Sequence, residues 1–343
     1  MNSVKTYQLE YSVLFLLLIL FFLINISLGS VRIPLQEIIN TLIGNEPSKE
    51  SWQYIVLNYR LPKAFTAIIV GGGLSLSGLL MQTLFRNPLA GPFVLGISSG
   101  ASLGVAILVM GSSLFTGIFT NYLMSSFSIA VAATIGSFLV FLSIAIVANR
   151  VKDTMALLII GLMFGSITTA VVSVLSYFTS KERLQQYIFW SFGSLGNLSW
   201  NQLSLLTFLF ITGILITVAV LKPLNAFLLG ENYAQSMGVA LKKSRYLIIV
   251  AASILAGSIT AFAGPIAFIG LAVPHLTRQL FKTQNHHVLV PATILFGAIL
   301  MLLCDTIAQL PNTAYSLPIN AITSIIGAPV VIWLLVRKRK MVF

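Results

Sequence analysis

The sequence predicts an all-helical integral membrane protein with about ten transmembrane helices. Of its 343 residues, 57% are hydrophobic and only 8% are charged, and the mean hydropathy is +0.97. Soluble domains carry about a quarter charged residues, so the composition excludes a water-soluble fold. The spans must be helical, because an unpaired backbone amide in lipid costs several kcal/mol and the sequence lacks the alternating strands of a membrane barrel.

Ten apolar stretches are candidate spans, and most approach the roughly 20 residues that a helix needs to cross about 30 Å of hydrocarbon. They are Val13–Leu28, Phe65–Leu84, Phe93–Met110, Tyr122–Ala148, Thr154–Tyr177, Leu203–Leu221, Tyr246–Phe262, Ile266–Leu280, Val288–Ala308 and Ile319–Val336. The eighth stretch is short and contains Pro274, which predicts a partial helix buried among its neighbours.

An even number of spans puts both termini on one side of the membrane, and the distribution of basic residues identifies that side. With both termini in the cytoplasm, the inner segments hold more than two thirds of the 20 Lys and Arg residues. This orientation makes residues 29–64 and 178–202 outer loops and residues 222–245 an inner segment of a single membrane domain over residues 1–343.

The net charge of +12 reflects this topology and does not indicate a nucleic-acid partner, because the basic residues are scattered over short loops. The tail Arg337–Lys340 is expected to touch anionic lipid headgroups.

A short Ala-Gly-Pro motif occurs twice, at residues 90–92 and 263–265. The predicted topology puts the first copy at the cytoplasmic face and the second at the outer face. Matching motifs on opposite sides are typical of an inverted repeat, here one that relates spans 2–5 to spans 7–10. A three-residue match is also compatible with chance, so the repeat is one of two interpretations.

Ionisable groups inside the predicted spans are too few for catalysis. Asp305 is the one acidic residue within a span, and the sequence contains no His-Glu-x-x-His or Gly-Lys-Ser/Thr motif. No catalytic residue, metal site or bound cofactor is therefore predicted for this chain. Asp305 lies near the outer end of its span, where we expect it to anchor the helix or to pair with an outer cation; a proton relay is the alternative.

The fifth predicted span carries a stripe of hydroxyl side chains. Ser166, Thr169, Ser173 and Ser176 are spaced 3, 4 and 3 residues apart, which places them on one face of a helix. Such a face could line a translocation path. Each hydroxyl could equally bond to a carbonyl one turn back in a closely packed helix, so both interpretations stay open.

A series of short motifs extends from residue 60 to the last span. They are Arg60-Leu61-Pro62-Lys63, Asn87–Pro92, Leu95–Ala101, Gly193-Ser194-Leu195, Leu229-Gly230-Glu231, Met237-Gly238-Val239, Phe268–Leu271, Pro274–Arg278 and Gly327-Ala328-Pro329. In this order they closely resemble the permease subunits of iron-siderophore, haem and cobalamin ABC importers. The resemblance covers the chain from about residue 55 to the C-terminus.

This resemblance implies a dimer of ten-helix subunits with the type II importer permease fold in a bacterial cell membrane. It implies as partners a second permease, two cytoplasmic ATPase subunits that bind ATP and magnesium, and an extracellular substrate-binding protein. The chain itself is then a transport subunit and not an enzyme. The implied cargo is a bulky iron chelate carried by alternating access, a ferric siderophore first, haem next and cobalamin last.

By the same resemblance, residues 222–245 correspond to the coupling helices that insert into the ATPase. The implied coupling residues are Leu229, Gly230, Glu231, Ala234, Met237 and Gly238. Gly230 and Gly238 can end and redirect short helices, and Glu231 can cap a new helix start. The alternative is a plain polar inner loop.

Arg60 and Lys63 align with family positions whose basic side chains meet carboxylates of the binding protein. Their spacing puts both on one side of the helix. Because an exposed ion pair contributes only about 0–1 kcal/mol, we expect these residues to steer docking more than to tighten it. The alternative is that the two cations anchor the span at the headgroups.

The sequence departs from the family pattern near the last outer loop. Gln309, Ser316 and Asn320 stand where Arg, Glu and Gly are frequent. These departures suit a heterodimer with a second, non-identical permease. Two other classes stay open on the sequence alone, a secondary transporter driven by an ion gradient and a membrane-embedded enzyme.

Overall fold

The computed structural model describes residues 7–45, 48–111, 125–150, 154–310 and 315–336. Regular structure within these ranges is helical and includes no strand, which confirms the predicted all-helical class. The start of the fourth predicted span, from Tyr122, and the tail Arg337–Lys340 lie outside the described residues.

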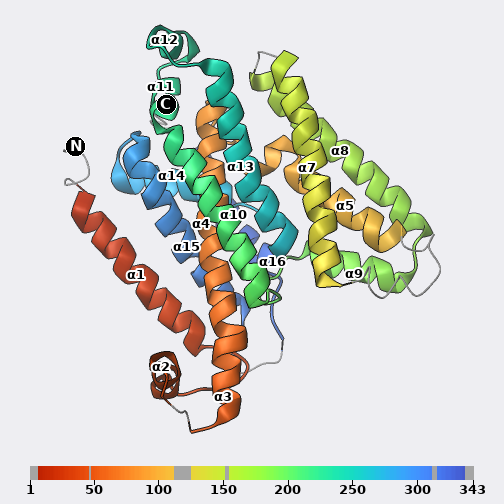
Figure 1. Ribbon diagram of the computed structural model, residues 1–343, viewed down its shortest axis with the longest axis vertical. Coiled ribbons are helices and arrows are strands. Elements are labelled where there is room, and N and C mark those ends of the chain that lie inside the picture. The colour runs from red at the N-terminus through yellow and green to blue at the C-terminus, as the bar shows by residue number, and fades with distance from the viewer. Residues whose placement is uncertain (1–6, 46–47, 112–124, 151–153, 311–314, 337–343) are drawn as a thin grey trace. The chain divides into compact units, whose positions relative to one another are not determined.

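The helices are labelled in Figure 1. They are α1 (Gln8–Ser27), α2 (Leu35–Ile43), α3 (Glu50–Ile55), α4 (Leu61–Leu84), α5 (Ile97–Gly111), α7 (Ser126–Arg150), α8 (Thr154–Phe178), α9 (Lys181–Ser191), α10 (Trp200–Ala219), α11 (Leu221–Phe227), α12 (Glu231–Ser236), α13 (Leu241–Ala263), α14 (Ile269–Phe281), α15 (His286–Ala308) and α16 (Ile319–Val336). A π-helix, η2 (Val56–Arg60), joins α3 to α4, and a 3-10 helix, η3 (Pro92–Leu95), precedes α5.

Each predicted span falls on a helix, and the ends of the predicted span and of the observed helix differ by a few residues. The helices concerned are α1, α4, α5, α7, α8, α10, α13, α14, α15 and α16. Seven helical segments among the described residues are long and apolar enough to cross a bilayer, and α5 and α16 are shorter apolar helices. The prediction of a partial eighth span is confirmed, because α14 has 13 residues, contains Pro274 and is buried along most of its length.

The chain divides into two compact units. Unit 1 consists of Met1–Leu76, Ser194–Phe208 and Ile266–Val342, and α1 and α15 lie side by side in it. The Tyr11 hydroxyl donates to Val288 O near the start of α15, at 2.7 Å, and residues near the end of α1 contact the end of α15. The two helices therefore run in the same direction, as the alternation of ten spans requires for the first and the ninth.

Helix α4 runs in the opposite direction to α15, as expected for the second span. Lys63 near the start of α4 pairs with Asp305 near the end of α15. Farther along, two glycines bring the helix backbones together, since a Cβ atom built on Gly71 would lie 2.2 Å from Gly297 O. Small residues at such crossings let transmembrane helices approach closely.

Unit 2 contains Ser77–Gly193 and Leu209–Pro265, and an antiparallel pair formed by α5 and α7 lies within it. A Cβ atom on Gly100 would lie 2.5 Å from Gly136 O, and one on Gly104 would lie 2.1 Å from Ala132 O. Both α8 and α13 pack against α5. Close backbone contact between α5 and α7 thus depends on residues without large side chains.

The two Ala-Gly-Pro motifs share a local conformation. In each case a residue in the left-handed region comes directly before the following helix: Gly96 at φ 67° before α5, and Phe268 at φ 66° before α14. This conformation is costly for a residue with a side chain. The shared geometry supports the inverted repeat, which stays a prediction.

Candidate functional sites

Residues 222–245 fold as two short helices that precede α13. Helix α11 ends at Phe227, and Gly230 follows at φ 105° before α12 begins. Gly238, at φ 79°, then separates α12 from α13. Both backbone conformations favour glycine, because other residues lack access to them without strain. The prediction that Gly230 and Gly238 end and redirect short helices is confirmed, and the coupling role of the segment stays a prediction.

An ion pair holds α12 to the start of α13. The Arg245 guanidinium donates from Nη2 to Glu231 Oε1 at 2.6 Å. Glu231 is the first residue of α12 and its side chain makes no capping hydrogen bond, so the expected capping role is wrong. The carboxylate instead uses a partner 14 residues farther along the chain, which the two turns bring back to it.

Large apolar side chains of this segment are exposed. Leu229, Tyr233 and Met237 are 62%, 54% and 60% exposed, and Leu229 and Met237 flank α12 at its two ends. Ala234, another of the predicted coupling residues, is fully buried, so it packs α12 against the rest of the chain. Exposed apolar groups gathered on a polar segment are typical of a surface that binds a partner.

In unit 1, Arg60 binds the C-terminal end of α1. Its guanidinium donates from Nη1 to Ile26 O at 2.8 Å and to Ser27 O at 2.9 Å, and from Nη2 to Val31 O. The last carbonyls of a helix have no partner within it and carry partial negative charge, so a cation there is stabilising. Arg60 is only 8% exposed, and the premise that it forms an exposed ion pair is wrong.

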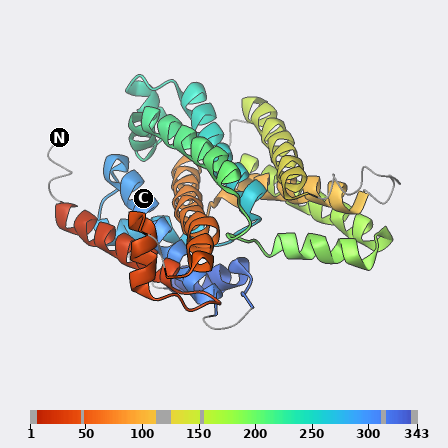
Figure 2. The ribbon, with the colours of Figure 1, turned by 60° about the horizontal axis from the view of Figure 1, so that its bottom comes forward.

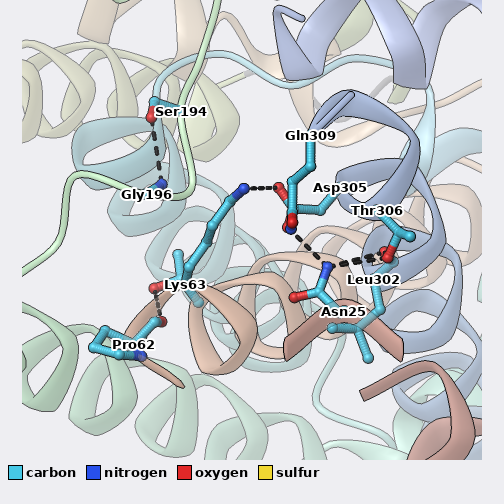
Figure 3. A network of polar contacts seen from close by, with 10 residues as sticks. Asn25, Pro62, Lys63, Ser194, Gly196, Leu302, Asp305, Thr306 and Gln309 are labelled. Carbon is cyan, nitrogen blue, oxygen red and sulfur yellow. Dashed lines mark hydrogen bonds and ion pairs between the residues drawn. The ribbon is translucent and has the colours of Figure 1, made fainter. Parts of the chain in front are cut away.

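Lys63 faces a second helix end, that of α15 (Figure 3). Its Nζ lies 3.1 Å from Asp305 Oδ1, and the two side chains are 22% and 4% exposed. The expected pairing of Asp305 with a cation is thereby confirmed. Both cations lie on one side of their helix, as their spacing predicts, but that side faces α1 and α15 of the same chain.

Two amides complete the surroundings of Asp305. Asn25 Nδ2 donates to Asp305 Oδ2 at 2.9 Å and to Thr306 Oγ1 at 3.1 Å, and Gln309 Nε2 donates to the same Oδ2 at 2.8 Å. Asn25 Oδ1 is buried and accepts no hydrogen bond. The amide points its nitrogen at the carboxylate because the reverse orientation would place two acceptors face to face. We call Asn25, Lys63, Asp305, Thr306 and Gln309 the outer polar network.

Replacing Asp305 by Ala should destabilise the protein. Lys63 and two amides would lose their acceptor, and breaking a buried pair costs about 3–5 kcal/mol, with the lower end expected here because Lys63 is partly exposed. Gel filtration of the detergent-solubilised protein after heating should show an earlier loss of the folded peak.

The double variant Lys63→Met, Asp305→Leu removes both charges together, so it should recover much of this loss. Lys181→Met, at an exposed position of α9, is the matched control and should behave like the wild type. Equal heat resistance of Asp305→Ala and wild type would show that the pair adds nothing to stability.

The hydroxyl stripe of α8 has features of both a path lining and a packed helix face. Each hydroxyl donates to a carbonyl one turn back; the bonds are Ser166 to Leu162 O at 3.3 Å, Thr169 to Gly165 O at 3.0 Å, Ser173 to Thr169 O at 2.8 Å and Ser176 to Val172 O at 2.8 Å. Close packing is not found, because Ser166, Thr169 and Ser173 are exposed. Bonds of this kind satisfy the donors and leave the oxygen atoms able to accept from a passing molecule.

The positions that depart from the family pattern have roles inside this chain. Gln309 belongs to the outer polar network, and the Asn320 side chain accepts a hydrogen bond from the Ala267 backbone N–H at 3.0 Å. Ser316 is exposed. Gln309 and Asn320 therefore make contacts within unit 1. Ser316 is left as the position where a partner could supply a missing contact.

Sequence reasoning did not single out two of the residues that complete these sites. Asn25 is an amide near the end of an otherwise apolar span, and a single polar residue in such a span could have indicated a polar contact. Arg245 was counted as one of many inner cations, and nothing in its local sequence marks it as the partner of Glu231.

Seven helical segments of the described residues are long and apolar enough to cross a bilayer, and such a bundle defines a multi-pass membrane protein. The FecCD transport family matches residues 17–337, which is nearly the whole chain. The chain belongs to this family and is a permease subunit of an ABC transporter.

Two curated relatives are permeases of named transport systems. The haemin transport system permease HmuU of Yersinia pestis is 35% identical over 324 residues, which cover 94% of this chain and 95% of HmuU. The vitamin B12 import system permease BtuC of Klebsiella pneumoniae is 36% identical over 326 residues, which cover 94% of this chain and 92% of BtuC.

Solved structures agree with this assignment. A metal-chelate type ABC transporter in an inward-facing conformation matches with a TM-score of 0.82 and 29% identity, over 94% of this chain and 97% of that one. PsaBC of Streptococcus pneumoniae in complex with Fab matches with a TM-score of 0.54 and 16% identity, over 88% and 95% of the chains, and this likeness shows the fold alone.

Proposed function

We propose that this chain forms the membrane path of an ATP-driven importer for a bulky metal chelate, in a bacterial cell membrane with both termini in the cytoplasm. The observation that carries the proposal is the two-helix segment at residues 222–245, with its exposed apolar residues and its ion pair. Two such chains, or this chain and a second permease, enclose the path. Two ATPase subunits supply the energy, and a binding protein delivers the cargo.

The exposed apolar residues of the 222–245 segment are suited to insertion into a groove of the ATPase. Leu229, Tyr233 and Met237 would leave water on binding, and each buried apolar side chain contributes about 1.5–3 kcal/mol. The Glu231–Arg245 pair holds α12 to α13, a helix of 23 residues, so a displacement of α12 would be transmitted to a span. ATP and magnesium belong to the partner.

Ion-gradient coupling is disfavoured by the carboxylates of the described spans. Glu10 lies in the first turn of α1, and Asp305 lies near the end of α15 in contact with Lys63. Coupled transporters place ionisable groups near the middle of the membrane, where their cost is justified by function. Among the described helices no carboxylate lies at such a depth.

The docking of a binding protein on the outer face rests on Lys63 more than on Arg60. The Lys63 side chain is 22% exposed beside Asp305, so it can reach an acidic group of a partner. Arg60 is buried against the end of α1 and shapes the surface without touching the partner.

The exposed hydroxyls of α8 are our candidates for the path lining, namely Ser166, Thr169 and Ser173 with Ser176 beside them.

For the cargo we keep the order ferric siderophore, then haem, then cobalamin. The names of the two relatives describe transport of haemin and of vitamin B12, and both cargoes are large chelates. Haem uptake is therefore of particular interest in the test that follows. A cell strain that lacks this chain should lose uptake of one of these radiolabelled compounds and regain it on complementation. Retention of uptake for all of them would contradict the proposed cargo class.

The energy source is tested in proteoliposomes. Vesicles that contain this chain, its permease partner and the ATPase should accumulate the chelate when ATP and the binding protein are supplied, and an uncoupler should leave the rate unchanged. Accumulation by this chain without an ATPase, abolished by the uncoupler, would show a secondary transporter instead.

A further inference from the structure

Helix α2, in the outer segment that follows α1, is short and sharply bounded. Pro34 precedes it and Gly44 follows it at φ 86°, so local sequence sets its nine residues. Its inward face is anchored in unit 1, because Ile38 is fully buried and Thr41 is 5% exposed. The helix is therefore a fixed part of the unit, and its other faces are presented outward.

One outward face of α2 is apolar. Leu35, Ile39, Leu42 and Ile43 are 52%, 42%, 40% and 70% exposed, and their spacing places them on one stripe. A soluble surface would not gather four large aliphatic side chains on two turns of helix without a partner.

The remaining face of α2 is polar and includes Gln36, Glu37 and Asn40. Glu37 accepts hydrogen bonds from the Ser48 hydroxyl at 2.5 Å and from the Ser48 backbone N–H at 3.0 Å. These bonds lower the pKa of the Glu37 carboxyl, which keeps it charged. Helix α2 therefore has three different faces: one that packs against unit 1, one that is apolar and exposed, and one that is polar.

The position of α2 along the spans identifies the medium that its apolar face contacts. Helix α1 has 20 residues, about 30 Å, which matches the hydrocarbon thickness, so its end at Ser27 marks a bilayer boundary. Arg60 of η2 binds Ile26 and Ser27 at that level, and α2 contacts both α1 and η2. Helix α2 therefore lies at the boundary itself.

The direction of α2 fits this position. In Figure 1 α2 is seen end-on whereas α1 and α3 with α4 are seen from the side, and Figure 2 shows it from another angle. Helix α2 is thus crosswise to the spans of unit 1, as a helix in the plane of a membrane surface would be.

We propose that α2 is an interfacial helix whose stripe of Leu35, Ile39, Leu42 and Ile43 lies among the lipid headgroups and upper acyl chains, with Glu37 toward water. The lipid surface is favoured over a docked protein because the stripe lies at the level where the lipid-exposed surface of α1 ends. This contact would fix the depth of the outer end of α1 and of the α3–η2–α4 helix in the bilayer.

Site-directed spin labelling tests the proposal. Cys304, the one cysteine of the chain, is replaced by Ala, and a nitroxide is attached at Ile39→Cys, Ile43→Cys or, as the matched control on the polar face, Gln36→Cys. The full chain is placed without other proteins in nanodiscs of phosphatidylcholine and phosphatidylglycerol. Collision rates with oxygen, which enters lipid, and with a water-soluble nickel chelate are then measured.

The ratio of oxygen to nickel collisions should be several-fold higher at residues 39 and 43 than at residue 36. Equal nickel collisions at all three positions would show that the stripe faces water, as a docking surface for an absent protein would, and would overturn the proposal. Exclusion of both reagents at 39 and 43 would show a covering by protein and would overturn it too. Since these positions are exposed, the labels should leave the fold intact, which gel filtration checks.

Discussion

Reversing the charge of Glu231 should abolish uptake while the protein stays folded in the membrane. Glu231→Arg places two guanidinium groups where Arg245 now donates to a carboxylate at 2.6 Å, and like charges at that distance repel. Helix α12 would then separate from the start of α13, so hydrolysis in the ATPase would proceed without moving the span. We expect normal membrane insertion, retained ATP hydrolysis and loss of most uptake in proteoliposomes.

The swap variant Glu231→Arg, Arg245→Glu distinguishes two explanations. If the pair positions α12, the swap should restore most of the uptake that each single reversal removes, because the opposite charges meet again. If Glu231 contacts the ATPase directly, the swap should stay inactive. Lys242→Glu, an exposed charge reversal on the same turn of α13, is the control for a general effect of charge. Normal uptake by Glu231→Arg would remove this residue from coupling.

A methyl group at the crossing of α4 and α15 should destabilise the protein strongly. In Gly71→Ala the new Cβ would lie 2.2 Å from Gly297 O, and in Gly297→Ala it would lie 2.4 Å from Gly71 O. Backbone atoms cannot rotate away, so the helices must separate, and overpacking of this kind costs about 1–3 kcal/mol or more. Thermal unfolding can be followed with a thiol-reactive dye, because the single cysteine, Cys304, is buried until the bundle opens.

The double variant Gly71→Ala, Gly297→Ala should cost less than the sum of the two single variants, because helices that one methyl has separated accept the second more easily. The matched control is Gly111→Ala at the end of α5, where the nearest atom to a new Cβ lies 4.0 Å away. An unfolding temperature for Gly71→Ala equal to that of Gly111→Ala would contradict the close crossing.

The sequence predicted the spans well because lipid imposes a simple rule on them. Long apolar stretches must be helices, so every predicted span falls on one, and Pro274 with a short apolar run was enough to mark α14 as partial. Glycines at positive φ are also local signals, which is why the turns at Gly230 and Gly238 could be predicted.

The partners that single charged residues have within the chain were not predicted in the same way. The sequence placed Arg60, Lys63 and Glu231 at the correct ends of helices, yet it assigned their side chains to partners or to a cap. In the structure these groups bind within the chain, to the end of α1, to Asp305 and to Arg245. A charged group near the end of a helix pairs with whichever complementary group the packing brings close, and in these three cases the partner lies between 14 and more than 200 residues away.

The sequence alone is enough to identify a helical membrane permease and to locate its spans, because burial in lipid leaves local signals. The tertiary structure was needed to show which charges form ion pairs, that Ala234 is buried and that α2 lies crosswise to the spans of unit 1 (Figure 1). These features depend on contacts between helices that are distant in sequence, and the strength of such contacts depends on separations of a few ångströms that no local pattern encodes.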